Sequence, residues 1–362
     1  GSSAGYSAQA ANSIAIGNQA GRDAQGTYAV TVGYEAGKTS QGSQATAIGR
    51  NAATLSQGSE AVAIGYYAGY NVQGAASVAV GQQAGQHDQG SASVAIGIFA
   101  GSTTQGNNAT AVGVNAGYNA QGASATAVGN SAGKTSQGVN SVAVGDSAGK
   151  TSQGVNSVAV GHLAGQTSQG TYTVAVGVNA GYNAQGNNSV AIGSLAGQVS
   201  QGAQGVAIGE QAGSADQGVN SVAVGRLAAK HSQGDNCVAI GNEAGFNAQV
   251  ASAVAMGQNA GYNAQGNQSV AVGLASGKVS QGAYSVAVGR YAGCNAQGAS
   301  ATAVGNQAGF ASQGANSVAV GYLAGLNVQG ANSVAVGDQA GSADQGIQSV
   351  AVGYVAAETS QG

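Results

Sequence analysis

One pattern of sixteen residues repeats along almost the whole chain without insertion or deletion. It begins with a five-residue segment such as Ser141-Val142-Ala143-Val144-Gly145, and at Ser157 the same five residues begin again. With this serine as position one, twenty-two units start at residue 13 and at every sixteenth residue after it. A fixed period of this length predicts a solenoid, in which each unit forms one coil and stacks on the coil before it.

Positions one to four of the unit predict a short β-strand. Position two is always Val, Ile or Thr, position four is Val or Ile except at Met256, and position three is Ala except at Thr31. β-Branched residues at alternate positions favour a pleated strand with one apolar face. We therefore expect the Val and Ile side chains to fill the core of the coil. The small residues would then form an outward association face, represented by Ser141, Ala143, Ser157 and Ala159.

Glycine marks the predicted corners of the coil. Position five is Gly in every unit, and Gly dominates positions nine and fourteen. The exceptions are Ala53, Ala229 and Ala357 at position nine, and Ala10 and Val250 at position fourteen. Because Gly tolerates positive φ, we expect the most demanding backbone at position five. Corners where Ala or Val replaces Gly are expected to have no positive φ.

A glutamine occupies position thirteen of every unit, from Gln9 to Gln361. Identical amides stacked about 4.8 Å apart can form a hydrogen-bonded ladder, of which Gln137, Gln153 and Gln169 are representative. A row of Gln donors presented to a ligand is the alternative interpretation. All charged residues fall at positions six, seven, ten, eleven, twelve, fifteen and sixteen, which predicts that these positions face solvent.

Composition and charge exclude several classes of protein. Only 6% of the residues are charged and the formal net charge is −3, so the chain lacks the basic patch that nucleic-acid binding requires. No apolar run is long enough for membrane insertion. Cys237 and Cys294 lie several coils apart, beyond the reach of a disulfide. Because the repeat pattern continues to both ends, we expect residues 1–362 to form a single tandem-repeat β-solenoid domain that is a segment of a longer repeat protein or filament.

The pentamers SVAVG and SVAIG, such as Ser141 to Gly145 and Ser93 to Gly97, resemble the head repeats of the YadA-like trimeric autotransporter adhesins and related repeats of viral and phage fibres. The resemblance extends along the whole chain. Here the unit is longer and adds elements such as Ala148-Gly149 and Gln153-Gly154. The resemblance implies a parallel β-roll, association of three chains and a role as a surface adhesin.

These patterns together predict an all-β fold, a parallel β-solenoid of the β-roll or β-helix type. We expect an elongated rod of about 23 stacked sixteen-residue coils. A single coil buries too little apolar surface to offset the entropy of ordering its backbone, so its stability must come from the hydrogen bonds between coils.

No reaction is predicted from the sequence. The segment Gly145 to Thr151 resembles a phosphate-binding loop, but it has three residues between its glycines where four are required. The histidines, His87, His162 and His231, are dispersed, and no row of aspartates suggests a calcium site. We expect no catalytic residue, no cofactor and no metal site, and hence no enzyme.

Aromatic residues recur at position ten and form a candidate surface for lateral or glycan contact: Tyr70, Tyr118, Tyr182, Phe246, Tyr262 and Phe310. Exposed rings can contact a sugar or a neighbouring chain.

The leading functional hypothesis is a structural repeat protein that forms the shaft or body of an extracellular, cell-surface or virion fibre, by coil stacking and self-association into a homo-oligomeric trimer or a filament. The alternative is an adhesin head that binds a glycan or receptor on a host surface. An ice-binding protein is less favoured, because the threonines at position eleven do not form an unbroken row.

Overall fold

The computed structural model divides the chain into two compact units, one covering Gly1–Asn183 and the other beginning at Ala184. Residues 1–358 are described, and Gln361, the last glutamine of the position-thirteen series, lies outside them. Each unit is an all-β parallel solenoid, and the described residues contain no helix. The predicted fold class is therefore confirmed.

Each regular coil contributes one strand to each of two parallel sheets. The strand at positions two to four belongs to a sheet that we call the valine sheet, and the strand at positions eleven to thirteen belongs to the glutamine sheet. In the first unit the valine sheet contains β1 (Ile14–Ile16), β2 (Val30–Val32), β3 (Thr46–Ile48), β5 (Val62–Ile64), β7 (Val78–Val80), β9 (Val94–Ile96), β11 (Thr110–Val112), β13 (Thr126–Val128), β15 (Val142–Val144), β17 (Val158–Val160) and β19 (Val174–Val176). Its glutamine sheet contains β4 (Ser56–Gln57), β6 (Val72–Gln73), β8 (His87–Gln89), β10 (Thr103–Gln105), β12 (Asn119–Gln121), β14 (Thr135–Gln137), β16 (Thr151–Gln153) and β18 (Thr167–Gln169).

The second unit repeats this plan. Its valine sheet contains β21 (Val190–Ile192), β23 (Val206–Ile208), β25 (Val222–Val224), β27 (Val238–Ile240), β29 (Val254–Met256), β31 (Val270–Val272), β33 (Val286–Val288), β35 (Thr302–Val304), β37 (Val318–Val320), β39 (Val334–Val336) and β40 (Val350–Val352). Its glutamine sheet contains β22 (Val199–Gln201), β24 (Ala215–Gln217), β26 (His231–Gln233), β28 (Asn247–Gln249), β30 (Asn263–Gln265), β32 (Val279–Gln281), β34 (Asn295–Gln297), β36 (Ser312–Gln313) and β38 (Val328–Gln329). The remaining strand, β20 (Asn183–Gln185), begins at the last residue of the first unit.

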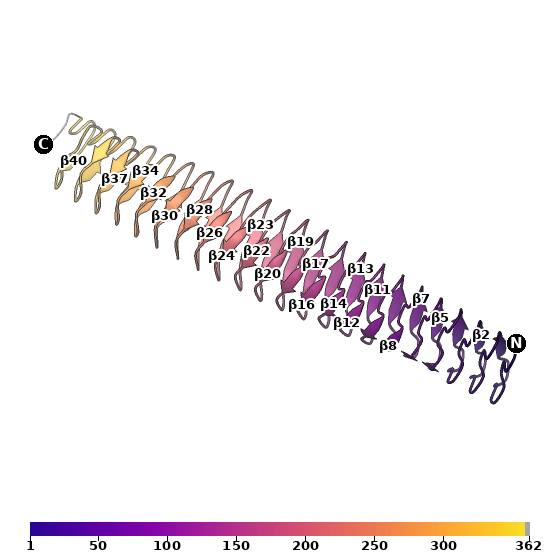
Figure 1. The fold of residues 1–362 in the computed structure, drawn as a ribbon. Helices are drawn as coiled ribbons and strands as arrows, with labels where there is room; N and C mark the ends of the chain where they lie inside the picture. The colour runs from indigo at the N-terminus through magenta and orange to yellow at the C-terminus, as the bar shows by residue number, and fades with distance from the viewer. Residues whose placement is uncertain (359–362) are drawn as a thin grey trace. The chain divides into compact units, whose positions relative to one another are not determined.

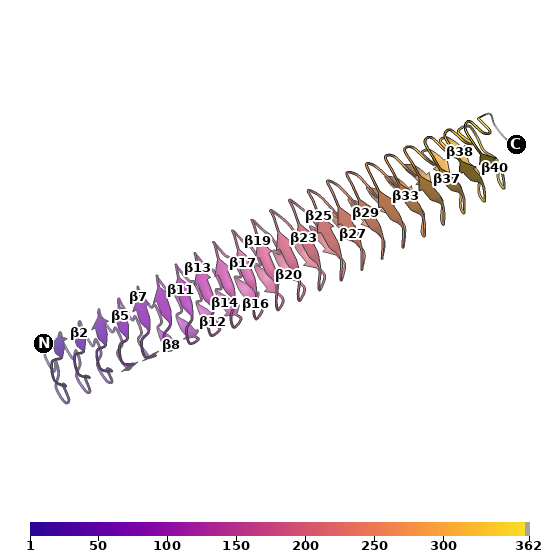
Figure 2. The ribbon, with the colours of Figure 1, turned by 180° about the vertical axis from the view of Figure 1, so that it is seen from behind.

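Neighbouring coils pair in exact sixteen-residue register within each unit. Strand β15 pairs in parallel with β17, which places Val142 opposite Val158. Strand β16 pairs with β18, which places Gln153 opposite Gln169. Figure 1 shows β5, β7, β11 and β13 in one row of the first unit, and Figure 2 shows β12, β14 and β16 in a second row from behind. One added residue would break this register and turn every side chain to the opposite face.

The two faces of the valine strands are the reverse of those predicted. The four residues expected to form the association face are fully buried inside their own coils: Ser141, Ala143, Ser157 and Ala159. Val142 and Val144 lie on the outer face, where they are partly exposed. The predicted core and the predicted association face are therefore both wrong, because the strand turns its small residues inward.

The interior is narrow because glutamine already fills it, and the largest side chain at position three is the buried Thr31. A Cβ atom added to Gly149 would lie 2.8 Å from Gln153 Oε1 and 3.2 Å from the Cβ of Ala143. In the second unit, alanines of positions three and eight form a buried cluster that extends from Ala287 to Ala351. Serine fits at position one because its hydroxyl has a partner inside the coil: Ser141 Oγ donates to the carbonyl oxygen of Gly138 at 2.6 Å.

The glycines serve two different purposes. At position five, Gly145 has φ of 130°, and a Cβ added there would lie 2.6 Å from the carbonyl oxygen of Gly161 in the next coil. The prediction that this corner is the most demanding agrees with that geometry. At position nine, the prediction that a corner with Ala in place of Gly has no positive φ was wrong, since Ala53 and Ala229 both have a φ of 46°.

Position fourteen needs glycine for space. Gly122 has no positive φ, but a Cβ added to it would lie 2.6 Å from the backbone nitrogen of Val139. As predicted, Ala10 and Val250, which replace Gly at this position, also lack a positive φ.

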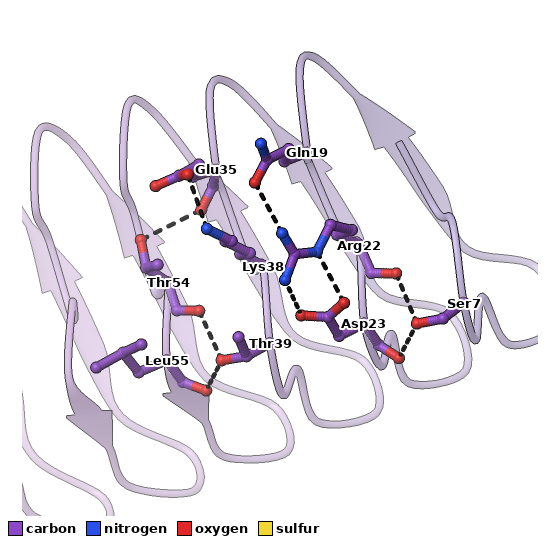
Figure 3. Close-up of polar contacts among 9 residues, drawn as sticks. All are labelled: Ser7, Gln19, Arg22, Asp23, Glu35, Lys38, Thr39, Thr54 and Leu55. Carbon is purple, nitrogen blue, oxygen red and sulfur yellow. Dashed lines mark hydrogen bonds and ion pairs between the residues drawn. The ribbon is translucent and has the colours of Figure 1, made fainter. Parts of the chain in front are cut away.

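Polar side chains on the outside of the first unit form contacts within coils and between successive coils (Figure 3). Lys38 Nζ donates to Glu35 Oε1 at 2.8 Å, and the Thr54 hydroxyl donates to the carbonyl oxygen of Glu35 at 3.2 Å. Arg22 forms an ion pair with Asp23, with 2.7 Å between Nη2 and Oδ2. The hydrogen bond from Lys38 is the main cause that lowers the pKa of Glu35. The stability that this pair contributes is present above the unfolded pKa of glutamate and is lost as the pH falls through the lower folded pKa.

Candidate functional site

The outer face of each valine sheet carries a row of apolar side chains. We call the outward residues at positions two and four of a unit its valine stripe. In the first unit the stripe runs over the strands from β1 to β19, and its isoleucines are well exposed, with Ile96 at 40%. The second unit has the same arrangement from β21 to β40, with Ile192 at 39%. A continuous apolar surface on a protein is typical of an interaction site.

The stripe is uniform because coil stacking places identical side chains next to one another. Val142 lies opposite Val158, and Val144 lies opposite Val160. Ala143, which lies between Val142 and Val144 in the same strand, is buried. Because successive side chains of a strand point to opposite faces, both valines must point outward. No charged residue occupies position two or four in any unit. The arrangement therefore offers a surface that can be buried by another apolar surface without desolvating a charge.

The glutamines of position thirteen lie inside the coil, where some neighbouring amides are hydrogen-bonded to each other, but Gln137 does not donate to Gln153. Gln121 Nε2 donates to Gln137 Oε1 at 3.1 Å. Gln137 Nε2 donates to the carbonyl oxygen of Thr126 at 2.8 Å, and Gln153 Nε2 donates to that of Val142 at 2.8 Å. The Oε1 atom of Gln153 is buried without a hydrogen-bond partner. Because these amides are buried, they are not presented to a ligand, and Gln169 is buried in the same way.

The position-ten aromatics are half-buried and contact other rings of the chain in most cases. Tyr70 packs edge-on against Tyr67, with ring centroids 4.8 Å apart. Phe246 and Tyr262 stack with an interplanar angle of 4°. Tyr118 packs against Phe99, Phe310 packs against Tyr291, and Tyr182 is half-buried. These rings therefore do not form one continuous exposed stripe, since much of their surface is already covered.

A second aromatic group was not singled out from the sequence. Tyr34, Arg50 and Tyr66 occupy position six of three consecutive coils. All three side chains are exposed, and the Arg50 Cζ atom lies 5.8 Å from the centroid of each tyrosine ring. The signal was available in the sequence, because an arginine stands between two tyrosines at the same repeat position.

A local hollow lies in the second unit at the corner where Val250 replaces the usual Gly of position fourteen. An open cavity of about 420 Å³ is lined by Asp216, Gln233, Gln249 and Val250, among others. A Cβ added to Gly234, in the preceding coil, would have its nearest contact at 2.8 Å, with the backbone nitrogen of Ala251. The cavity thus lies at the corner where Val250 replaces Gly.

The potential metal ligands are dispersed in the described part of the chain. Residues 1–358 contain no group of three His, Cys, Asp or Glu side chains placed to hold a metal ion. His87 and His231 pack against Tyr70 and Phe246, respectively. Among the same residues, no helix is long and apolar enough to cross a membrane.

The fold and its outward stripe define a class: a parallel β-solenoid of short coils with small and amide side chains inside and β-branched side chains outside. The sequence model of the YadA head domain repeat matches four segments of the chain, residues 40–68, 136–164, 168–196 and 329–356. The chain therefore carries YadA-like head repeats, as the pentamer indicated. A search of curated proteins found no significant match.

Proposed function

We propose that the chain is a structural repeat protein that forms the shaft or body of an extracellular or surface fibre, and that copies of the chain associate through the valine stripe. The observation that carries this proposal is the outward direction of Val142, Val144 and their counterparts in a fold whose interior needs no large apolar residue. Burial of apolar surface contributes roughly 25 cal/mol per Å², so a stripe this regular favours association of copies over exposure to water.

The match to YadA head repeats supports the same proposal, because it suggests an adhesin-type, fibre-like surface protein. It also supports a non-enzymatic role and a homo-oligomer, for which the resemblance to trimeric adhesins favours a trimer. The location follows as the cell surface or the extracellular space.

Sedimentation equilibrium tests the proposal. The test variant replaces Val142 and Val144 with Glu, and Val158 and Val160 with Lys, so that opposite charges face each other between adjacent coils and the sheet itself is preserved. The matched control replaces Val139 with Glu and Val155 with Lys, two exposed valines at position fifteen of adjacent coils.

We expect the natural chain and the control to sediment as an oligomer, and the stripe variant to sediment as a folded monomer. A natural chain that stays monomeric at high concentration, or a stripe variant that remains fully associated, would overturn the proposal. Far-ultraviolet circular dichroism establishes that each protein retains its β-structure.

A further inference from the structure

Coil stacking builds an aromatic and cationic surface at position six of the first unit. Tyr34, Arg50 and Tyr66 stand on three consecutive coils, and the sixteen-residue register places them side by side. The guanidinium of Arg50 lies between the two rings, 5.8 Å from each centroid. Both rings are more than two-fifths exposed, at 47% for Tyr34 and 42% for Tyr66. Two ring surfaces and one cation are thus open to the same solvent region.

Further rings extend this surface from Tyr66. The Tyr66 and Tyr67 centroids are 4.4 Å apart, and Tyr67 is followed by Tyr70 at 4.8 Å. His87 in the next coil lies 6.3 Å from Tyr70. Edge-to-face contacts of this kind hold the rings in fixed orientations, which lowers the entropy that a ligand must overcome on binding.

The positive charge of Arg50 is available. No carboxylate in residues 1–358 forms an ion pair with it. The neighbouring carboxylate, that of Glu35, is held by Lys38 at 2.8 Å and by the Asn51 amide at 2.9 Å. A guanidinium that keeps its fork of N–H donors free can bind a carboxylate in a bidentate manner.

The other two arginines at position six lack this setting. Arg226 lies 3.6 Å from Glu210 and 3.9 Å from Glu243, so its charge is already paired. Arg290 lies over one ring only, that of Tyr291, and its neighbours at position six are Leu274 and Asn306. The combination of an unpaired guanidinium and two flanking rings is specific to Arg50 among these three.

We propose that Tyr34, Arg50 and Tyr66 bind a sugar that carries a single carboxylate. The guanidinium of Arg50 donates to the carboxylate, and the parts of the two tyrosine rings that Arg50 leaves exposed contact the C–H groups of the sugar ring. A sulfated polyanion would need several clustered cations, whereas the other cation close by, Lys38, is engaged with Glu35. This site does not depend on association of copies through the valine stripe.

Two carboxylated sugars distinguish the source of the ligand: 3′-sialyllactose, which carries one sialic acid, and a hyaluronan disaccharide, which carries one glucuronic acid. Lactose serves as the neutral counterpart. Titration of the full chain by isothermal calorimetry or by NMR of the sugar measures the dissociation constants. We expect at least one acidic sugar to bind ten-fold or more tightly than lactose.

The variants R50Q and Y34A/Y66A are expected to lose this preference, and R50K to retain part of it. The matched control R290Q is expected to bind as the natural chain does. Equal binding of acidic and neutral sugars, unchanged binding by R50Q, or an equal loss in R290Q would each overturn the proposal. These variants keep their valine stripe, so their sedimentation separates a failure here from a failure of the fibre proposal.

Discussion

The side-chain amide of Gln121 donates to Gln137 Oε1 at 3.1 Å, and the same nitrogen donates to the carbonyl oxygen of Thr110 at 2.8 Å. One glutamine thus connects two coils and, within its own coil, connects the glutamine sheet to the valine sheet. Gln121 is only 3% exposed, so these bonds form away from water. The interior of the solenoid is therefore held by amide hydrogen bonds in addition to apolar contact.

Replacement of Gln121 by Ala is expected to destabilise the protein by about 1–3 kcal/mol, because it leaves buried hydrogen-bonding groups without a partner. Urea denaturation followed by circular dichroism measures the loss. The control is Ser136→Ala, an exposed position of the adjacent coil, which is expected to change stability by less than about 0.5 kcal/mol. Equal effects of the two substitutions would contradict the structural role of the ladder.

The variant Q121E adds a pH dependence with a defined sign. Burial disfavours a charged carboxylate, so the pKa of the introduced group is raised in the folded state. Its folded state binds more protons than its unfolded state, and stability falls as the pH rises above about 4.3, the pKa of an unperturbed glutamate. Unfolding midpoints compared between pH 4 and pH 7 test this. A variant with the pH profile of the natural chain would place Gln121 in contact with water.

The two kinds of positive-φ glycine are expected to respond differently to alanine. G149A has a natural precedent in Ala53 and Ala229, and its left-handed conformation costs about 1–2 kcal/mol. G145A is expected to cost more, because its Cβ meets the backbone of the next coil at 2.6 Å and its φ of 130° suits glycine alone. Chemical denaturation of both variants ranks them, and an equal or reversed order would be inconsistent with this account.

Both cysteines are expected to be unreactive in the native protein. Cys237 is fully buried and Cys294 is 5% exposed, and burial raises the pKa of each thiol. Because the pKa of each thiol is higher in the folded state, its contribution to stability is fully present at pH values below the unfolded pKa of about 8.5. This contribution is lost as the pH rises through the folded pKa. Titration with a thiol-specific reagent at pH 8 measures the outcome. Rapid modification before unfolding would show that the coils open locally.

Repeat length and strand position could be read directly from the sequence, because one inserted residue would break the pairing of Val142 with Val158. Charge also predicted the exposure of positions such as six and sixteen, as at Arg50 and Glu60, whereas position ten is partly or fully buried in most coils, as at Ser102. The orientation of the strand was not, since a β-branched face is normally the buried one. What reverses it is the length of Gln153, which reaches across the coil to the carbonyl oxygen of Val142. The pattern of apolar residues alone does not predict that a glutamine side chain occupies the core.

The candidate surfaces could likewise be predicted from the sequence only in part. Position-ten rings could be found by their period, but their partners at position seven, such as Tyr67 beside Tyr70, depend on how the corner folds. The Tyr34–Arg50–Tyr66 group required comparison of the same position in three consecutive coils.

The orientation of the valine strand is tested most directly by two double variants that add Leu to opposite faces. In A143L/A159L the new side chains enter the filled interior, and we expect a loss of at least about 1–3 kcal/mol per site or failure to fold. In V144L/V160L they lie on the partly exposed outer face, and we expect a change of less than about 0.5 kcal/mol per site. Thermal unfolding followed by circular dichroism should thus separate the two proteins widely. A stable A143L/A159L beside an unfolded V144L/V160L would show that the valines, and not the alanines, face the core.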